Sequence, residues 1–446
     1  MASGAALDVE VREASPAGQR TSLWWRITGV WFPPLVALLA GWALLAWRSG
    51  KHNLGLFQPS TWARYDSGHY LKIAQSGYYA VVCPKSSLRP TLPPNHLYMC
   101  GNAGWFPGYP GAMRGLSKLT GLSLPIAGLI IAWACWFLVL LLMWQLLAGA
   151  RSRPTRWVCL LIAAFFPGEV YFAALFPISL CIAGLLGCLY AALRGSRLAL
   201  AGVAFVSGAV AAYSYLTPMA VVPALLVTGL LAVRGRDRLR VLIAACGILV
   251  GFGAFLLTMR QATGRWNMYF LSAQHYGVGV HSPLTTLQDH LRPLWTPQPA
   301  KWQFLNYEAS QTLLALCFVG LAVLVTVGWA IWRPAAAPMT QTQETASQLE
   351  GDEPPAHHRS RDASWSKALT SRVSAFDLSF LLAALGVWLV PYVASGRVST
   401  YRSEAFVVLS VPLLRRLPSW LLLVPLAASV WVAWHMALYF FNGKLV

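Results

Sequence analysis

Long apolar runs separated by short arginine-bearing connectors dominate this chain of 446 residues. A helix needs roughly 20 apolar residues to cross a bilayer, where every backbone polar group must be satisfied internally. Only 11% of the residues are charged, against about 25% in soluble domains, and the mean hydropathy is +0.54. The chain is therefore predicted to be an all-α, polytopic membrane protein.

The apolar runs predict about eleven membrane-spanning helices. We place them at residues 27–47, 124–148, 157–176, 177–193, 198–214, 216–233, 241–259, 311–332, 378–394, 403–414 and 418–441. The connectors on one side carry Arg151, Arg153, Arg156, Arg194, Arg197, Arg234, Arg236, Arg238, Arg240, Arg415 and Arg416. Positive connectors stay in the cytoplasm, so this side and the N-terminus are predicted to be cytoplasmic. The net charge of +19 thus reflects topology, and no nucleic-acid partner is expected.

The chain divides into a tail, a core, a linker and a C-terminal membrane segment. Residues 1–22 form the cytoplasmic tail, 23–332 the transmembrane core, 333–376 a disordered cytoplasmic linker, and 377–446 the last transmembrane helices. The tail is too long and too mixed in charge for a signal peptide, so the first apolar run is expected to stay as an anchor. The outer loops 48–123 and 260–310 then face the extracytoplasmic side.

The first outer loop carries an isolated acid, Asp66, among aromatic residues. The segment that follows has Tyr70, Ile73 and Ala74 at helical spacing, and its aromatics favour the membrane interface. We expect a short interfacial helix that starts at or just after Asp66. The carboxylate either caps this helix, for about 1 kcal/mol, or takes part in chemistry.

Cys83 and Cys100 bracket a proline-rich polar stretch of the same loop. On an oxidising face they predict a disulfide, which would contribute on the order of 3 kcal/mol in the chain-entropy model, with two free thiols as the alternative. The other cysteines lie in apolar runs and are expected to be small core residues. No CxxC or HExxH spacing indicates a structural metal.

Sequence blocks in four places resemble one known family. They are WARYDSGHYLKIAQSGY (62–78), NAGWFPGYP (102–110), TGRWNMYFLSAQHYG (263–277) and STYRSEAFVVLSVPLL (399–414). In this order they are similar to blocks of the PIG-V family of mannosyltransferases, in the GT-C superfamily. The turns FPISL (176–180) and SYLTP (214–218) depart from that family, which carries an S-E-S-L-F-type and a T-R-P-like turn there. The resemblance is therefore to a divergent, bacterial-type branch.

The resemblance implies a GT-C-type fold and a membrane enzyme, in a bacterial cytoplasmic membrane, that works on the extracytoplasmic face. It implies transfer of a sugar, mannose in this family, from a polyprenyl-phosphate donor, with inversion. The acceptor hydroxyl belongs to a glycolipid, a glycan or a protein. Asp66 is then the general base, because an alcohol is a poor nucleophile until its proton is removed. The candidates for the donor phosphate are Arg402, Arg397 and Arg64, with snorkelling towards lipid headgroups as the alternative.

Further candidates for substrate contact are His69, Tyr70, Trp105, Tyr109, Glu169, Gln274 and His275. His69 either orients Asp66, ligates a metal or packs, and the aromatics either stack on a sugar or pack the loop onto the bundle. Glu169 falls within the third predicted span, roughly 10 Å from its outer end. There it either lines a substrate tunnel or is protonated and hydrogen-bonded between helices.

A divalent metal stays an open question, because one acid beside His69 is not the paired-carboxylate arrangement that such metals commonly use. Two other classes of function are compatible with the same loops: a lipid transporter or flippase, and a non-catalytic membrane scaffold. A transporter favours internal repeats and polar helices at mid-depth. The sequence has no convincing repeat, and its apolar runs are poor in charge, which favours the enzyme.

Overall fold

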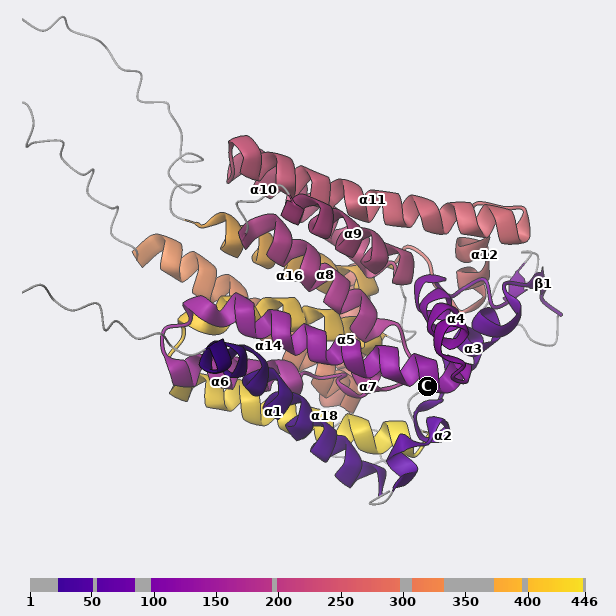
Figure 1. Cartoon of the computed structure of the whole chain (residues 1–446), viewed down its shortest axis with the longest axis horizontal. Helices are drawn as coiled ribbons and strands as arrows, with labels where there is room; N and C mark the ends of the chain where they lie inside the picture. Colours follow the sequence, from indigo (N-terminus) through magenta and orange to yellow (C-terminus); the bar gives the residue numbers. More distant parts are fainter. Residues whose placement is uncertain are drawn as a thin grey trace, which may run out of the picture.

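The computed structural model describes residues 23–50, 54–84, 98–194, 199–296, 307–332, 373–394 and 400–443, which form an all-α membrane protein (Figure 1). The predicted tail 1–22 and residues 333–372 of the predicted linker lie outside these ranges. The last two residues of that linker, Ala375 and Phe376, are helical instead, and the Phe376 ring packs against that of Phe380 with 4.6 Å between centroids. The helix α16 accordingly begins at Ala375.

Within the described ranges, 6 helices are long and apolar enough to cross a membrane. They are α1 (Leu23–Ser49), α5 (Leu124–Leu146, continued by η3, Leu147–Gly149), α11 (Gly235–Thr263), α14 (Tyr307–Trp332), α16 (Ala375–Ala394) and α18 (Ser419–Phe441). Shorter apolar helices are α8 (Ile178–Arg194), α9 (Ala199–Ser214) and α10 (Val221–Leu231, preceded by η4, Thr217–Ala220). All nine of these helices coincide with predicted spans. That the three shorter helices cross the membrane stays a prediction.

The structure differs from the remaining predicted spans. The span at 157–176 is interrupted: α6 (Arg153–Ala164) ends early, and only the short α7 (Val170–Ala173) follows. The reason is Pro167 followed by Gly168, since proline disfavours helical backbone before it and Gly168 adopts a left-handed φ of 97°. The span at 403–414 is instead a 3-10 helix, η6 (Ala405–Arg416), in which every residue except Arg416 is buried, so it has no lipid-facing side.

Small residues bring α9 and α11 into direct backbone contact. A Cβ atom at Gly247 would overlap the backbone of Phe205, and one at Gly251 would overlap that of Ala209. These glycines are four residues apart and share one face of α11. Such close approach is how helices associate in lipid, where apolar side chains gain little from leaving the solvent.

The arginine-bearing connectors meet at one end of the bundle. Arg415 and Arg416 both pair with Asp377, which is 1% exposed, at 2.8 Å for Arg415. The backbone N–H of Arg151 donates to the carbonyl of Arg415 at 2.9 Å, and Arg194 donates to the Leu146 carbonyl at 3.1 Å. These arginines therefore fasten helix ends to one another.

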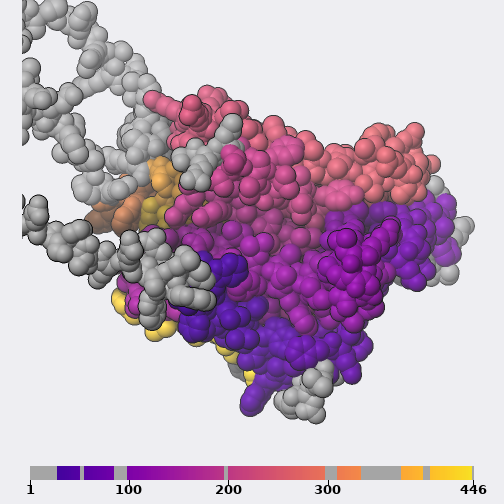
Figure 2. Space-filling model, in the orientation of Figure 1, coloured from indigo at the N-terminus to yellow at the C-terminus, as the bar shows by residue number. Residues whose placement is uncertain are grey.

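The opposite end is built from the first and second predicted outer loops (Figure 1), and it holds the candidate site. The first loop forms η1 (Leu54–Phe57), α2 (Pro59–Trp62), α3 (Ser67–Ser76), β1 (Ala80–Val82), β2 (Met99–Gly101) and α4 (Gly108–Thr120). The second forms α12 (Met268–His275), α13 (Pro283–Leu291) and η5 (Arg292–Leu294), and the short α17 (Thr400–Glu404) joins them. In Figure 2 the purple surface of the first loop adjoins the salmon surface at the end of α11.

The predicted disulfide is present. The strands β1 and β2 pair antiparallel, with Val81 opposite Cys100, and the sulfur atoms of Cys83 and Cys100 are bonded. The N–H of Cys83 also donates to the Tyr98 carbonyl at 2.9 Å. The disulfide therefore closes the base of a hairpin that packs against α12.

Removing this disulfide should loosen the hairpin. The variant C83S/C100S is expected to be less stable by about 3 kcal/mol, because the loop regains entropy in the unfolded chain. Thermal unfolding of the purified protein measures the change, with Cys317→Ser, an exposed free cysteine of α14, as the control. A melting temperature as high as that of the control variant would contradict a stabilising role for the disulfide.

Candidate active site

A tight turn places Asp66 between α2 and α3. The Ser67 hydroxyl donates to the Arg64 carbonyl at 2.7 Å, which closes the turn. Tyr65 has a φ of 54°, a left-handed conformation that is uncommon for a residue with a side chain, and is the one non-glycine residue with positive φ in the described chain. Its hydroxyl donates to the Phe440 carbonyl of α18 at 3.4 Å. Strain of this kind persists only where the surroundings impose it, and it is common at functional sites.

The carboxylate of Asp66 does not cap α3. Asp66 occupies the N-cap position, as expected from the sequence, and its backbone carbonyl accepts from the N–H groups of His69 and Tyr70. Its side chain makes no capping hydrogen bond. The backbone of Asp66 has helical dihedral angles, whereas a capping residue normally has extended ones. The capping alternative is therefore wrong, and the carboxylate is available for another role.

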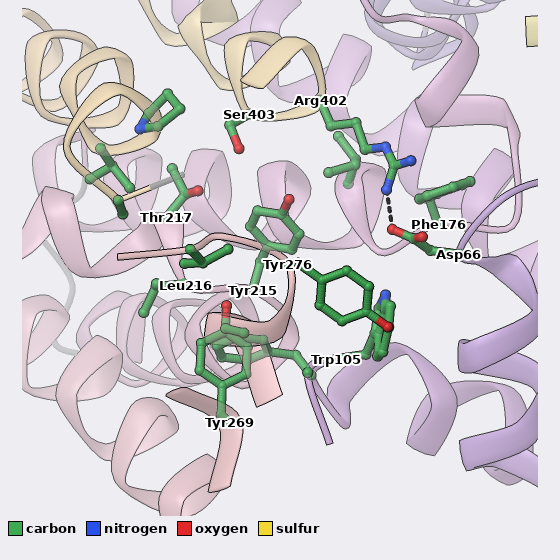
Figure 3. A pocket seen from close by; sticks show the side chains of 18 of the residues that line it. Asp66, Trp105, Phe176, Tyr215, Leu216, Thr217, Tyr269, Tyr276, Arg402 and Ser403 are labelled. Atoms are coloured by element: carbon green, nitrogen blue, oxygen red, sulfur yellow. Dashed lines mark hydrogen bonds and ion pairs between the residues drawn. The ribbon is translucent and has the colours of Figure 1, made fainter. Parts of the chain in front are cut away.

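Arg402 of α17 pairs with this carboxylate through its Nη1 atom (Figure 3). The two residues are 336 positions apart in the chain. The Arg402 side chain is 7% exposed, and its guanidinium lies against the Phe176 ring at 5.1 Å and the Tyr171 ring at 5.6 Å. Such aromatic contacts hold a cation without neutralising it. The structure thus brings the predicted base and the first phosphate candidate together.

A cavity of about 190 Å³ opens beside this ion pair (Figure 3). Its wall contains Asp66, Tyr70, Gly104, Trp105, Phe106, Phe176, Ile178, Tyr215, Leu216, Thr217, Tyr269, Ala273, Tyr276, Val278, Val390, Pro391, Ala394, Arg402 and Ser403. Each of the sequence blocks described above contributes to it, and so do both divergent turns. Segments that are distant in sequence therefore meet around one hollow.

Among the described residues, the wall has charge at one place only. Asp66 and Arg402 are its charged residues, and the rest is aromatic, aliphatic or hydroxyl-bearing, with Tyr215, Thr217 and Ser403 among the hydroxyls. The volume is below the range of roughly 300–1,000 Å³ typical of drug-sized ligands. Such a hollow suits a small polar group with neutral hydroxyls and one anionic end.

The predicted aromatic contacts divide between the wall and the core. Tyr70 and Trp105 line the cavity, as does Tyr276. Tyr109 does not: it is fully buried, and its hydroxyl donates to the Gly128 carbonyl of α5 at 2.9 Å. Tyr109 therefore packs the loop onto the bundle, which is the second of the two roles expected for it.

His69 packs against the back of the wall. Its ring stacks on Trp105 with 3.6 Å between centroids and 10° between planes, and it is not part of the cavity lining. Burial lowers the pKa of His69, and the nearby Asp66 raises it by a smaller amount. This contact supports the packing role, and through Trp105 it fixes one side of the cavity.

The depressed pKa of His69 predicts a pH-dependent stability. As the pH falls, His69 of the unfolded chain is protonated first, near its ordinary pKa of 6.5. Neutral His69 therefore contributes its full share to the folding stability above pH 6.5. This share is lost as the pH drops from 6.5 towards the lower pKa that His69 has in the folded protein. His69→Phe keeps a ring on Trp105 and removes the titration. Melting temperatures from about pH 8 to about pH 5 should fall more for the wild type than for this variant. Equal slopes would show that His69 is not the titrating group.

The other phosphate candidates are not placed with Arg402. Arg64 donates from Nε to the Thr61 carbonyl at 3.5 Å and does not line the cavity. Arg397 lies outside the described residues. Arg402 is thus the one arginine of the cavity wall within the described part of the chain.

Two predicted substrate contacts of α12 lie behind the wall. Gln274 and His275 do not line the cavity, whereas Tyr269, Ala273 and Tyr276 around them do. His275 instead approaches Cys83 and Cys100, and the three ligand atoms lie within 4.8 Å of one another. Because these sulfurs are bonded to each other, they offer no thiolate to a metal. Among the described residues, this is the one cluster of three or more His, Cys, Asp or Glu side chains that is compact enough to hold a metal ion.

Glu169 lies in the break between α6 and α7, not within a helix. It is 1% exposed, and neither carboxylate oxygen has a hydrogen-bond partner among the described residues. The cavity wall does not include it. Among the described residues, the expected hydrogen bond between helices is therefore not observed at Glu169, and a place along a substrate tunnel stays a prediction.

Several residues of the site were not predicted from the sequence. Phe176 and Tyr215 belong to the turns that differ from the resembled family, and both contact the cavity. Tyr269 and Tyr276 belong to the third block and are seven residues apart. This helical spacing could have indicated that the two rings lie on the same face.

No protein-family model matches this chain, and no curated protein matches it either.

Proposed function

We propose that the protein is a membrane glycosyltransferase that moves a sugar from a polyprenyl-phosphate donor to an acceptor hydroxyl at the extracytoplasmic face. The observation that carries this proposal is the convergence of all four sequence blocks on one cavity that holds Asp66 and Arg402. Mannose as the sugar, a glycolipid, glycan or protein as the acceptor, and inversion at the anomeric carbon come from the resemblance to the PIG-V family.

The charge distribution of the cavity supports a donor with one anionic end. A guanidinium binds phosphate through paired N–H groups, and here it lies in a low-dielectric wall where the attraction is strong. The charge that develops on the departing lipid phosphate would be stabilised by Arg402. The hydroxyl-bearing and aromatic remainder of the wall suits an uncharged sugar ring.

Asp66 is the proposed general base. Arg402 binds its Oδ2 atom, and among the described residues Oδ1 makes no hydrogen bond, so its lone pairs are free to accept the proton of an acceptor hydroxyl. The Asp66 side chain is 31% exposed, which leaves it open to the cavity. A phosphate that binds Arg402 would also compete with Asp66 for the guanidinium, and would so release the carboxylate for proton transfer.

A lipid transporter is the second candidate, and the broken helix at Glu169 favours it, because transporters use discontinuous helices at their binding sites. The two functions differ in whether the sugar–phosphate bond breaks. Purified protein in liposomes with polyprenyl-phosphate mannose and a crude membrane-lipid extract as acceptor should release polyprenyl phosphate and form a mannosylated product. Movement of the intact donor between leaflets, with no cleavage, would support the transporter and contradict the enzyme.

A further inference from the structure

The short helix α17 carries three consecutive side chains that face different parts of the molecule. Arg402 pairs with Asp66, and Ser403 lies in the cavity wall together with Tyr215. Glu404 is not part of the cavity lining, and its side chain instead contacts α14 and α16. A helix of 5 residues is not stable by itself, so tertiary contacts must set its position.

Glu404 makes the most deeply buried of these contacts. It is 1% exposed, and its Oε1 atom accepts hydrogen bonds from the Tyr392 hydroxyl at 2.6 Å and the Thr312 hydroxyl at 2.7 Å. Tyr392 lies on α16 and Thr312 on α14, so this carboxylate joins α17 to two long helices. Burying a carboxylate is costly unless hydrogen bonds compensate for the lost water, and charge-assisted bonds of this kind are strong.

We propose that Glu404 is a positioning residue for Arg402, and that it sets the affinity of the cavity for the phosphate of a lipid-linked substrate. This inference rests on the proposed function. The Asp66 contact of Arg402 is shared or lost when a phosphate binds, whereas the hydrogen bonds of Glu404 lie outside the cavity and persist. Glu404 is therefore the anchor that keeps the guanidinium in place through the reaction.

The test compares two ligands that differ only in the phosphate. Binding of farnesyl phosphate and of farnesol to the full-length protein in detergent is measured for the wild type, Glu404→Leu, Glu404→Gln, Arg402→Gln and the double variant E404L/R402Q. The wild type should prefer farnesyl phosphate. Glu404→Leu should bind farnesyl phosphate about tenfold more weakly, with little change for farnesol, because it removes two hydrogen bonds to a charged group.

The conservative and double variants separate positioning from a general loss of structure. Glu404→Gln keeps an acceptor oxygen for Tyr392 and Thr312, so it should retain most of the preference for the phosphate. If Glu404 acts through Arg402, the double variant should bind farnesyl phosphate no more weakly than Arg402→Gln alone. The same tenfold loss in both backgrounds would show that Glu404 acts independently and would overturn the inference.

Other outcomes are equally informative. Wild-type affinity in a folded Glu404→Leu variant would overturn the role of Glu404 and leave the proposed function standing. A wild type that binds both ligands equally would remove the phosphate site itself, and the inference with it. Should Glu404→Leu fail to fold, Tyr392→Phe and Thr312→Val each remove one donor, and unchanged phosphate preference in both would overturn the inference.

Discussion

Replacing Asp66 with asparagine should lower kcat for sugar transfer by about 10²–10⁴-fold, the usual contribution of a positioned general base. Asparagine has the same shape and still offers Arg402 an oxygen, so the wall of the cavity should persist. It cannot take a proton from the acceptor hydroxyl. The KM for the donor should stay the same or fall, because the guanidinium loses an anionic competitor for the phosphate. Steady-state kinetics with a labelled lipid-linked sugar measure both constants.

A matched substitution controls for the loss of a carboxylate. Asp237→Asn changes an acid that is 61% exposed, pairs with Arg240 and lies on an arginine-bearing connector at the start of α11. This variant should transfer sugar at the wild-type rate. If Asp66→Asn is folded, as judged by its melting temperature, and is as active as Asp237→Asn, then Asp66 is not the base.

Replacing Arg402 with glutamine should lower kcat/KM for the donor by about 10²–10³-fold, as expected when a preorganised charge at a developing anion is removed. Both constants should worsen, because the guanidinium is proposed to bind the phosphate in the ground state and to stabilise it further as the sugar departs. This pattern differs from that of Asp66→Asn, in which the donor KM stays the same or falls. Kinetics at varied donor concentration therefore separate the two roles.

Lysine at position 402 is the companion variant. It keeps the positive charge and loses the planar paired donors, so it should recover part of the activity that glutamine loses. Arg402 is 7% exposed and its partner Asp66 is 31% exposed, so part of the charge is screened by solvent and the loss of stability should be modest. Equal donor KM values for wild type, lysine and glutamine variants would exclude phosphate binding by this residue.

The sequence was sufficient for features that depend on local patterns. Apolar runs located the long helices, the spacing after Asp66 located α3, and a polar stretch between cysteines located the disulfide. The break at Pro167 and Gly168 also had a local signal, since this dipeptide marks turns, but the surrounding apolar run outweighed it. Glu169 was misplaced within a helix for the same reason.

The site itself depends on contacts that no local pattern contains. The pairing of Asp66 with Arg402 joins residues 336 positions apart, and only the packing of the loop end brings them together. The roles of Glu404 and His69 likewise follow from their neighbours: Glu404 lies between hydroxyls of two helices, and His69 lies on Trp105. The four sequence blocks contain segments that surround the cavity, and packing decides which side chain in each segment reaches it.

A cryo-EM map of the protein bound to polyprenyl-phosphate mannose would show whether the cavity beside Asp66 and Arg402 is the donor site. We expect phosphate density at the Arg402 guanidinium, the sugar within the cavity, and Asp66 facing the anomeric carbon. Phosphate density at the opposite end, beside Arg415 and Arg416, with the cavity next to Asp66 empty, would contradict this expectation.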